Sequence, residues 1–339
     1  MARHGVVCGG SWCVDRNNVI DYWPQQDGHA RILSEETQGG GSGTNMAVDL
    51  RRLAAPFPVE AITLVGDDAD GRFLIGLCRD WEIDAAQVHI TTEVPTSVTH
   101  VMSARDTGRR TFFYFPGTMA LIGPEHFDFW RSKAAILHLG LPGTMDRMDA
   151  PFEDDESGWV AVLKKAKAAG MRTNIELVTI PEARLAGLTR PCLPYLDYLV
   201  VNDFEAGAVA GVETVADGMA DPAACRKAAE AILAMGAAEL VVVHFPEGCV
   251  AAARDGTRVS RPSVNVPRDV IAGANGAGDA FASGMLLAIH EGWRLDDALK
   301  LAHATAATSL RAVTTNGAVE NWRECLRLAD AWSWRKDIS

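Results

Sequence analysis

Short apolar segments alternate with helical patterns along most of the chain, and this alternation restricts the possible folds strongly. Most of the apolar segments are continuous over four or five residues, which is typical of strands covered on both faces. They are residues 5–11, 61–66, 135–142, 172–178, 198–202 and 240–245. Between them, apolar residues recur at helical spacing, as Met46, Leu50 and Leu53 do. The alternation predicts an α/β fold, with a central, mainly parallel sheet between helices.

Two stretches interrupt this alternation. Residues 19–33 and 96–115 alternate polar with apolar side chains and contain β-branched and aromatic residues. Strands with one solvated face suit a small separate sheet rather than a central one. Such a sheet could act as a lid that excludes water from a substrate. We therefore expect one α/β domain over residues 1–339, with lid strands from about 16–38 and 94–117 inserted in it.

The composition excludes several classes of protein. The net charge is -12, and the acidic residues are spread along the chain, which argues against a nucleic-acid binder. Seven scattered cysteines with no CxxC pair indicate reduced thiols rather than disulfides or a zinc site. The first residues lack the apolar core of a signal peptide, and no apolar run is long enough to span a membrane. We expect a cytoplasmic protein without nucleic-acid or membrane partners.

The strongest chemical signal is the segment Gly273-Ala274-Asn275-Gly276-Ala277-Gly278-Asp279, which leads into an apolar helical pattern. Small residues let a ligand approach the backbone, and a helix start offers unpaired N–H groups to an anion. Asp279 is expected near the N-cap, where its carboxylate could be a simple cap. Beside a phosphate, the same carboxylate could orient an alcohol and accept its proton.

A second glycine-rich segment, Gly39-Gly40-Gly41-Ser42-Gly43-Thr44-Asn45, also precedes a helical pattern. It follows the predicted lid instead of the first strand and lacks the third glycine of a dinucleotide fingerprint, which disfavours a nicotinamide dehydrogenase. Its backbone amides and Asn45 could meet a polyol. A flexible loop before a helix is an equally good reading of these residues alone.

Taken together, several segments in chain order resemble the ribokinase (PfkB) family of sugar and nucleoside kinases. Gly10–Asp15 resembles the family's first strand and its substrate-binding Asp, and the segment from Gly40 to Ala47 resembles its GGxxxN signature. Three further matches are Val65-Gly66-Asp67-Asp68-Ala69-Asp70-Gly71 to VGxDxxG, Asn202-Asp203-Phe204-Glu205 to NxxE, and Gly276-Ala277-Gly278-Asp279 to GAGD. His303-Ala304 and Asn316-Gly317-Ala318 resemble the segments around the adenine pocket and the nearby monovalent-cation loop.

The resemblance implies a ribokinase-like three-layer sandwich with a β lid, and a homodimer formed through that lid. It implies ATP-dependent transfer of the γ-phosphoryl group to a hydroxymethyl group of a sugar or nucleoside, with Asp279 as base. Gly276, Ala277 and Gly278 would form the anion hole, and Asp15, Gly40, Gly41 and Asn45 would bind the acceptor. The residues implied for ATP and Mg²⁺ are Asn202, Glu205 (on the metal through water), His244, Gly248, Asn275 and His303.

Two departures from the family pattern leave an alternative open. Gly273-Ala274 stands where the family usually has Asp-Thr, which weakens the case for a monovalent cation. In His244-Phe245-Pro246-Glu247-Gly248, Pro246 removes a backbone donor and Glu247 adds a negative charge near the expected phosphates. His244 itself could be a ligand contact or only a strand-end histidine. The alternative is a catalytically weak, kinase-like ligand-binding or sensor protein.

Overall fold

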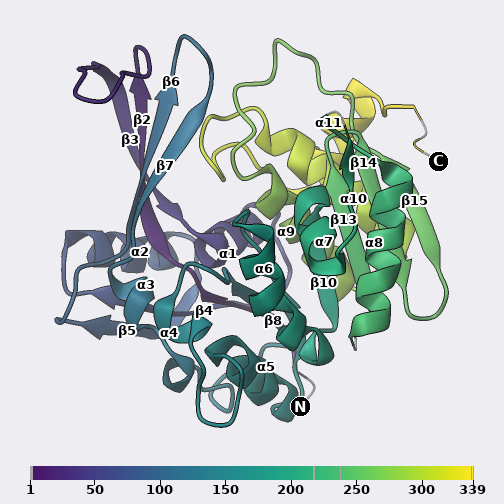
Figure 1. Cartoon of the computed structure of the whole chain (residues 1–339), viewed down its shortest axis with the longest axis horizontal. Helices are drawn as coiled ribbons and strands as arrows, with labels where there is room; N and C mark the ends of the chain where they lie inside the picture. The colour runs from purple at the N-terminus through teal and green to yellow at the C-terminus, as the bar shows by residue number, and fades with distance from the viewer. Residues whose placement is uncertain (1–2, 217, 237, 337, 339) are drawn as a thin grey trace.

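The computed structural model describes residues 3–216, 218–236, 238–336 and 338. Its largest element is a nine-stranded sheet, in which seven neighbouring strands are parallel and two at one edge are antiparallel (Figure 1). In spatial order the strands are β15 (Arg258–Pro262), β14 (Gly248–Ala253), β13 (Leu240–Phe245), β10 (Tyr198–Asn202), β9 (Arg172–Ile175), β8 (Ile136–Gly140), β1 (Val6–Gly10), β4 (Val59–Gly66) and β5 (Asp84–Thr91). Each of the six predicted segments overlaps a strand of this sheet.

Helices cover both faces of the sheet and enclose two apolar cores. The side chains of β1 alternate between them: Val6 and Cys8 enter one core and Val7 the other. The first core packs against α1 (Ser42–Arg52), α2 (Ala69–Asp80), α9 (Ala277–His290), α10 (Leu295–Ser309) and α11 (Trp322–Trp332). The second packs against α5 (Gly158–Ala168), α6 (Glu182–Thr189), α7 (Asp203–Ala210) and α8 (Pro222–Met235). The predicted α/β sandwich is confirmed.

Short elements connect these layers. They are α3 (Thr118–Leu121), α4 (Asp146–Asp149), β11 (Val215–Ala216), β12 (Met219–Ala220) and the 3₁₀ turns η1 (Pro124–His126) and η2 (Arg190–Tyr195). In the described part of the chain, no helix combines the length and the apolar character needed to cross a bilayer. All seven cysteines are buried and carry free thiols, as the dispersed pattern predicts.

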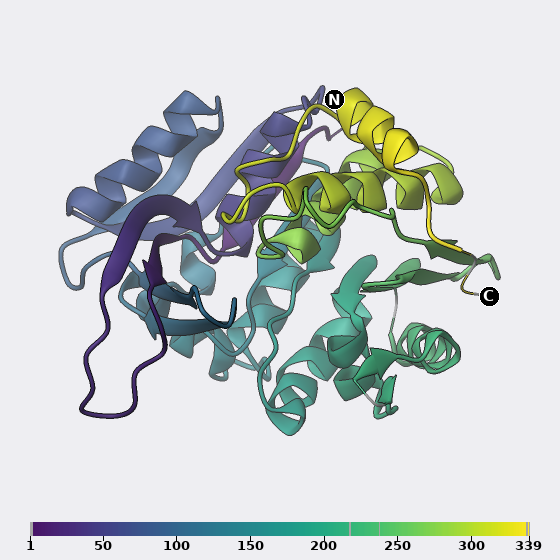
Figure 2. The ribbon, with the colours of Figure 1, turned by 90° about the horizontal axis from the view of Figure 1, so that it is seen from above.

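A second, four-stranded sheet forms the lid and stands away from the sandwich (Figures 1 and 2). Its order is β3 (Ile32–Gly40), β2 (Cys13–Ile20), β6 (Val98–Ala104) and β7 (Arg110–Phe115). The prediction of a strand across 19–33 is wrong in its middle. Pro24 has no backbone donor and Gly28 closes a turn onto Gln25, so residues 21–31 form a loop. The strands β2 and β3 instead extend inward to Cys13 and Gly40.

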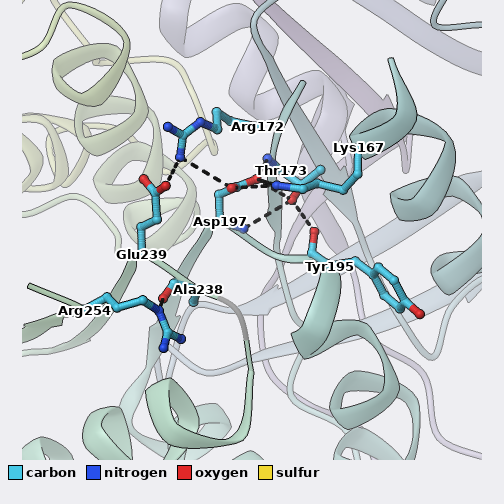
Figure 3. Close-up of polar contacts among 8 residues, drawn as sticks. All are labelled: Lys167, Arg172, Thr173, Tyr195, Asp197, Ala238, Glu239 and Arg254. Atoms are coloured by element: carbon cyan, nitrogen blue, oxygen red, sulfur yellow. Dashed lines mark hydrogen bonds and ion pairs between the residues drawn. The ribbon is translucent and has the colours of Figure 1, made fainter. Parts of the chain in front are cut away.

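A cluster of ion pairs joins the amino ends of the central strands (Figure 3). The buried carboxylate of Asp197, just before β10, accepts from Lys167 Nζ at 2.7 and 2.8 Å and from the backbone N–H of Thr173 at 2.8 Å. Arg172, at the start of β9, lies 3.4 Å from Asp197 and also pairs with Glu239, just before β13. Because these strands are parallel, their carboxyl ends meet at the opposite edge of the sheet.

Candidate active site

A cavity of about 650 Å³ lies at the carboxyl ends of the parallel strands. Ser11 follows β1, Leu141 follows β8, Glu176 follows β9, and Asn202 ends β10; all four line the cavity. The lid strand β7 adds the aromatic rings of Phe112 and Tyr114. In α/β folds this edge of the sheet is where ligands bind, because loops and helix starts converge there.

The lid and α1 supply the polar groups on one side of this cavity. Asp15 on β2, together with Gly41 and Asn45 at the start of α1, lines it. Gly40 lies behind Asp15: a Cβ at this position would approach the carboxyl of Asp15 to 2.2 Å, so the close packing requires glycine. Burial raises the pKa of Asp15 to about 6. A carboxyl and an amide facing one cavity are suited to bind neighbouring hydroxyl groups.

The amino end of α9 lies where this cavity meets a second one, and Gly278 lines both. Gly276 takes the left-handed conformation at the N-cap, with φ of 74°, so Asp279 is the third helical residue. Asp279 thus lies in the first turn, three residues after the N-cap, close to the expected position but not at the cap itself. Ala280 donates to the carbonyl of Gly276 at 2.9 Å. The N–H groups of Gly278 and Asp279 precede this first helical bond and remain available to a ligand.

The carboxyls of Asp279, Glu176 and Glu205 line the larger cavity, and all three are partly or fully buried. Burial and the neighbouring Glu176 raise the pKa of Asp279 well above its usual range, and a hydrogen bond from Asn45 opposes this shift. Burial likewise raises the pKa of Glu176 and of Glu205 to about 7 in each case. The raised pKa values allow a carboxyl in this site to exchange a proton near neutral pH.

A second cavity of about 360 Å³ lies beside the first and is mainly apolar. The phenyl ring of Phe281 lies 4.8 Å from the ring of His244 and 5.0 Å from that of His303. Burial lowers the pKa of His244 to about 4 and that of His303 to about 3, so both rings are neutral at pH 7. Four residues line both cavities: Asn202, His244, Ala274 and Gly278. The two cavities therefore meet at the start of α9.

Most of the predicted site residues line one of these cavities. The larger cavity includes Asp15, Gly41, Asn45, Asn202, Glu205, His244, Asn275, Gly278 and Asp279, and the smaller one adds Ala277 and His303. Three predicted residues line neither cavity: Gly40, which packs against Asp15, Gly276, which is the N-cap of α9, and Gly248, which begins β14 opposite Phe245 and Pro262.

Sequence reasoning missed three charged residues that line the cavities. Glu176 lines the larger cavity, and Asp203 and Arg335 line the smaller one. The signal for Glu176 was a single carboxyl between the apolar residues Ile175 and Leu177, near the end of a predicted strand segment. Arg335 lies in the segment after α11, and no pattern around it indicated a site.

Asn202 and Glu205 form a reciprocal cap at the start of α7. The Oδ1 of Asn202 accepts from the N–H of Glu205 at 2.8 Å, and the Oε2 of Glu205 accepts from the N–H of Asn202 at 3.1 Å. The described residues contain no cluster of three or more His, Cys, Asp or Glu side chains placed to hold a metal ion directly. The carboxylate of Glu205, one oxygen of which accepts from Asn202, suits a Mg²⁺ ion that keeps most of its water ligands.

Comparisons with known proteins agree with this geometry. The family model described as "pfkB family carbohydrate kinase" matches residues 4–322. An ATP-dependent ribose-1-phosphate kinase of Halopiger xanaduensis is 28% identical over 298 residues, covering 85% of this chain and 86% of its own. A probable fructokinase-7 of Arabidopsis thaliana is 27% identical over 331 residues, covering 93% of this chain and 88% of its own.

Solved structures show the same fold. A ribokinase of Arabidopsis thaliana, solved with ribose and ATP, has a TM-score of 0.77 at 21% identity, over 97% of this chain and 99% of its own. A ribokinase of Giardia lamblia has a TM-score of 0.80 at 16% identity, over 97% and 100%. The predicted ribokinase-like sandwich is therefore confirmed. With its fold, its paired cavities and a family match over nearly its whole length, the chain belongs to the pfkB family of carbohydrate kinases.

Proposed function

We propose that this kinase transfers the γ-phosphoryl group of ATP to a hydroxymethyl group of a sugar or nucleoside, with Asp279 as the base. The observation that carries the proposal is the position of Asp279. Its carboxyl lines the larger cavity one residue after Gly278, which lines both cavities. An acceptor in the larger cavity and a nucleotide in the smaller one would meet beside this carboxyl.

Each group at this junction has a part in the transfer. The acceptor oxygen forms a bond to the γ-phosphorus while its proton passes to the carboxylate of Asp279. The bond from phosphorus to the bridging oxygen breaks, and its electron pair leaves with ADP. The free N–H groups of Gly278 and Asp279, at the positive end of α9, face the negative charge on the phosphoryl oxygens.

The smaller cavity suits the nucleotide base, because its lining is mainly apolar and His303 is neutral. Asn202, Glu205, His244 and Asn275 would lie along the phosphates, with Arg335 as a further positive group. Mg²⁺ held through water by Glu205 would neutralise part of the phosphate charge.

The charge of the larger cavity favours a neutral acceptor. Asp15, Glu176, Glu205 and Asp279 contribute carboxyls to its lining, and none of the described lining residues is Lys or Arg. An acceptor that already has a phosphate would meet these carboxyls without a compensating cation. We therefore infer an unphosphorylated sugar or nucleoside, held by Asp15, Gly41 and Asn45.

The test is a product assay with ATP, Mg²⁺ and a panel of sugars, nucleosides and sugar phosphates. Asp279→Asn keeps the shape of the side chain and removes the base, so turnover should fall about 10²- to 10⁴-fold. Asp255→Asn, in the exposed turn between β14 and β15, should leave turnover unchanged. Undiminished turnover in Asp279→Asn would refute the base. Thermal stabilisation of the wild type by a sugar, without any product, would instead favour the sensor alternative.

We further propose a cytoplasmic homodimer that forms through the lid. The lid exposes several apolar side chains, among them Ile32 on β3 and Phe113 and Phe115 on β7, which are about half accessible. A second copy of the chain would cover this surface, which monomeric soluble proteins seldom leave open. The seven buried free thiols agree with a reducing compartment.

A further inference from the structure

A chain of buried polar side chains runs from the sheet to the proposed base. Asn174 on β9 and His138 on β8 are both fully buried, and Asn174 Nδ2 lies 2.9 Å from His138 Nδ1. His138 Nε2 in turn lies 3.0 Å from Glu176 Oε2. Glu176 and Asp279 line the same cavity, and their carboxyls are close enough that each shifts the pKa of the other. Adjacent strands therefore hold a carboxyl that shares the cavity with the base.

The protonation of His138 follows from its neighbours. The amide nitrogen of Asn174 can only donate, so Nδ1 of His138 accepts and the ring proton is on Nε2. Burial lowers the pKa of His138 to about 4, so the ring is neutral at pH 7. Its Nε2 lies 3.0 Å from Oε2 of Glu176, but the N–H is not directed well enough at this oxygen for a hydrogen bond, and neither atom has another partner among the described residues. The contact stabilises a negative charge on Glu176.

We propose that Glu176, held by His138, is a positioning residue that orients the carboxyl of Asp279 and makes Asp279 a stronger base toward the acceptor hydroxyl. This inference rests on the proposed role of Asp279. A carboxylate beside a second carboxyl increases the affinity of the pair for a proton. The acceptor's proton is then received by a pair of carboxyls and not by Asp279 alone.

The other ionisable groups around the pair leave this effect intact. They are Glu205 on α7, Asp15 on β2, Asp49 on α1, Cys8 on β1, His138 on β8 and His244 on β13. The three of these that can be anionic, Glu205, Asp15 and Asp49, act in the same direction as Glu176. The two histidines are neutral at pH 7, and so is the thiol of Cys8, because burial raises its pKa well above the usual value. Arg52 lies beyond Asp49 and opposes the acids there. Glu176 is distinguished from these acids by its contact with Asp279.

The experiment measures kcat and the acceptor KM from pH 5 to 9 for wild type and Glu176→Gln. Removing the neighbouring charge lowers the pKa of Asp279, so the acid limb of the kcat profile should move about one to three pH units downward. The plateau kcat should fall about tenfold, because the base is weaker. The acceptor KM should stay within about twofold of wild type, since the inferred interaction acts on the base.

Three further variants separate charge from packing. Glu176→Asp keeps the charge and should return the acid limb toward the wild-type pH. His138→Phe fills the same space without an N–H donor, so it should move the acid limb downward by less than Glu176→Gln does. Asp49→Asn removes a fully buried carboxyl that has no hydrogen-bond partner among the described residues, and it should shift the limb by less than about half a unit. Thermal unfolding of each variant reports whether it folds.

An acid limb that stays in place in folded Glu176→Gln would overturn the inference. A raised acceptor KM with an unmoved limb would do the same and would assign Glu176 to acceptor binding. If Glu176→Gln does not fold, the limb of Glu176→Asp and His138→Phe decides. Full turnover in Asp279→Asn would refute the proposed function itself, whatever Glu176 does.

Discussion

Replacing Gly276 by alanine should cost both stability and turnover, whereas the same change at Gly292 should cost stability alone. The two glycines flank the same helix, α9, and have similar left-handed φ angles of 74° and 68°. They differ in their surroundings. A Cβ at Gly276 would lie 2.3 Å from the carbonyl oxygen of Thr315 and 2.7 Å from its Cα, while a Cβ at Gly292 would meet nothing within 4 Å.

The expected costs follow from this difference. An alanine in the left-handed region costs about 1 kcal/mol at either position. At Gly276 the backbone of Thr315 must also shift, which adds about 1–3 kcal/mol. Gly276→Ala should therefore lose about 2–4 kcal/mol of unfolding free energy, and Gly292→Ala about 1 kcal/mol. Urea unfolding at a constant m-value measures both.

The kinetic expectation separates the two variants more sharply. A shift at Gly276 displaces the N–H groups of Gly278 and Asp279, which face the transferred phosphoryl in the proposed reaction. Loss of one such donor lowers kcat about 10²- to 10³-fold, and partial misplacement should lower it about 10- to 100-fold. Gly292→Ala should keep the wild-type kcat. If the two variants lose equal stability and both keep full turnover, the proposed anion site at the start of α9 is wrong.

Two further predictions concern parts of the molecule away from the reacting groups. Asp197→Asn should lower the free energy of unfolding by about 2–4 kcal/mol, because Lys167 and the buried N–H of Thr173 lose their charged partner (Figure 3). Glu239→Gln, at a half-exposed acid, should lower it by less than about 1 kcal/mol. The kcat should not change in either variant. Phe113→Glu should convert the proposed lid dimer to a monomer in light scattering, whereas Trp130→Glu, at an exposed tryptophan outside the lid, should not; a wild-type monomer would contradict the dimer.

The central strands could be predicted from the sequence because burial on both faces leaves continuous apolar runs. The run at 240–245, for example, matches β13 residue for residue. Strand order could not be predicted in the same way, since an apolar run indicates burial but not which strand lies beside it. The lid pattern was informative only in part: alternation identified one solvated face, but the loop at 21–31 depends on Pro24 and on a turn that closes locally.

The same distinction explains why Gly248 was predicted to lie at the nucleotide site, which it does not line, and why Glu176 was missed. The segment that ends in Gly248 follows β13 and was expected near the nucleotide. Because β14 pairs antiparallel with β13, Gly248 lies opposite Phe245 within the sheet, and Pro246 lines the smaller cavity instead. Glu176 could have been singled out, because a carboxyl at the end of a parallel strand lies at the edge where ligands bind. Its contact with Asp279 depends on β8 and β9 being neighbours and on α9 starting opposite them. Residue type can therefore predict that a side chain reaches this edge, while tertiary structure determines which group it acts upon.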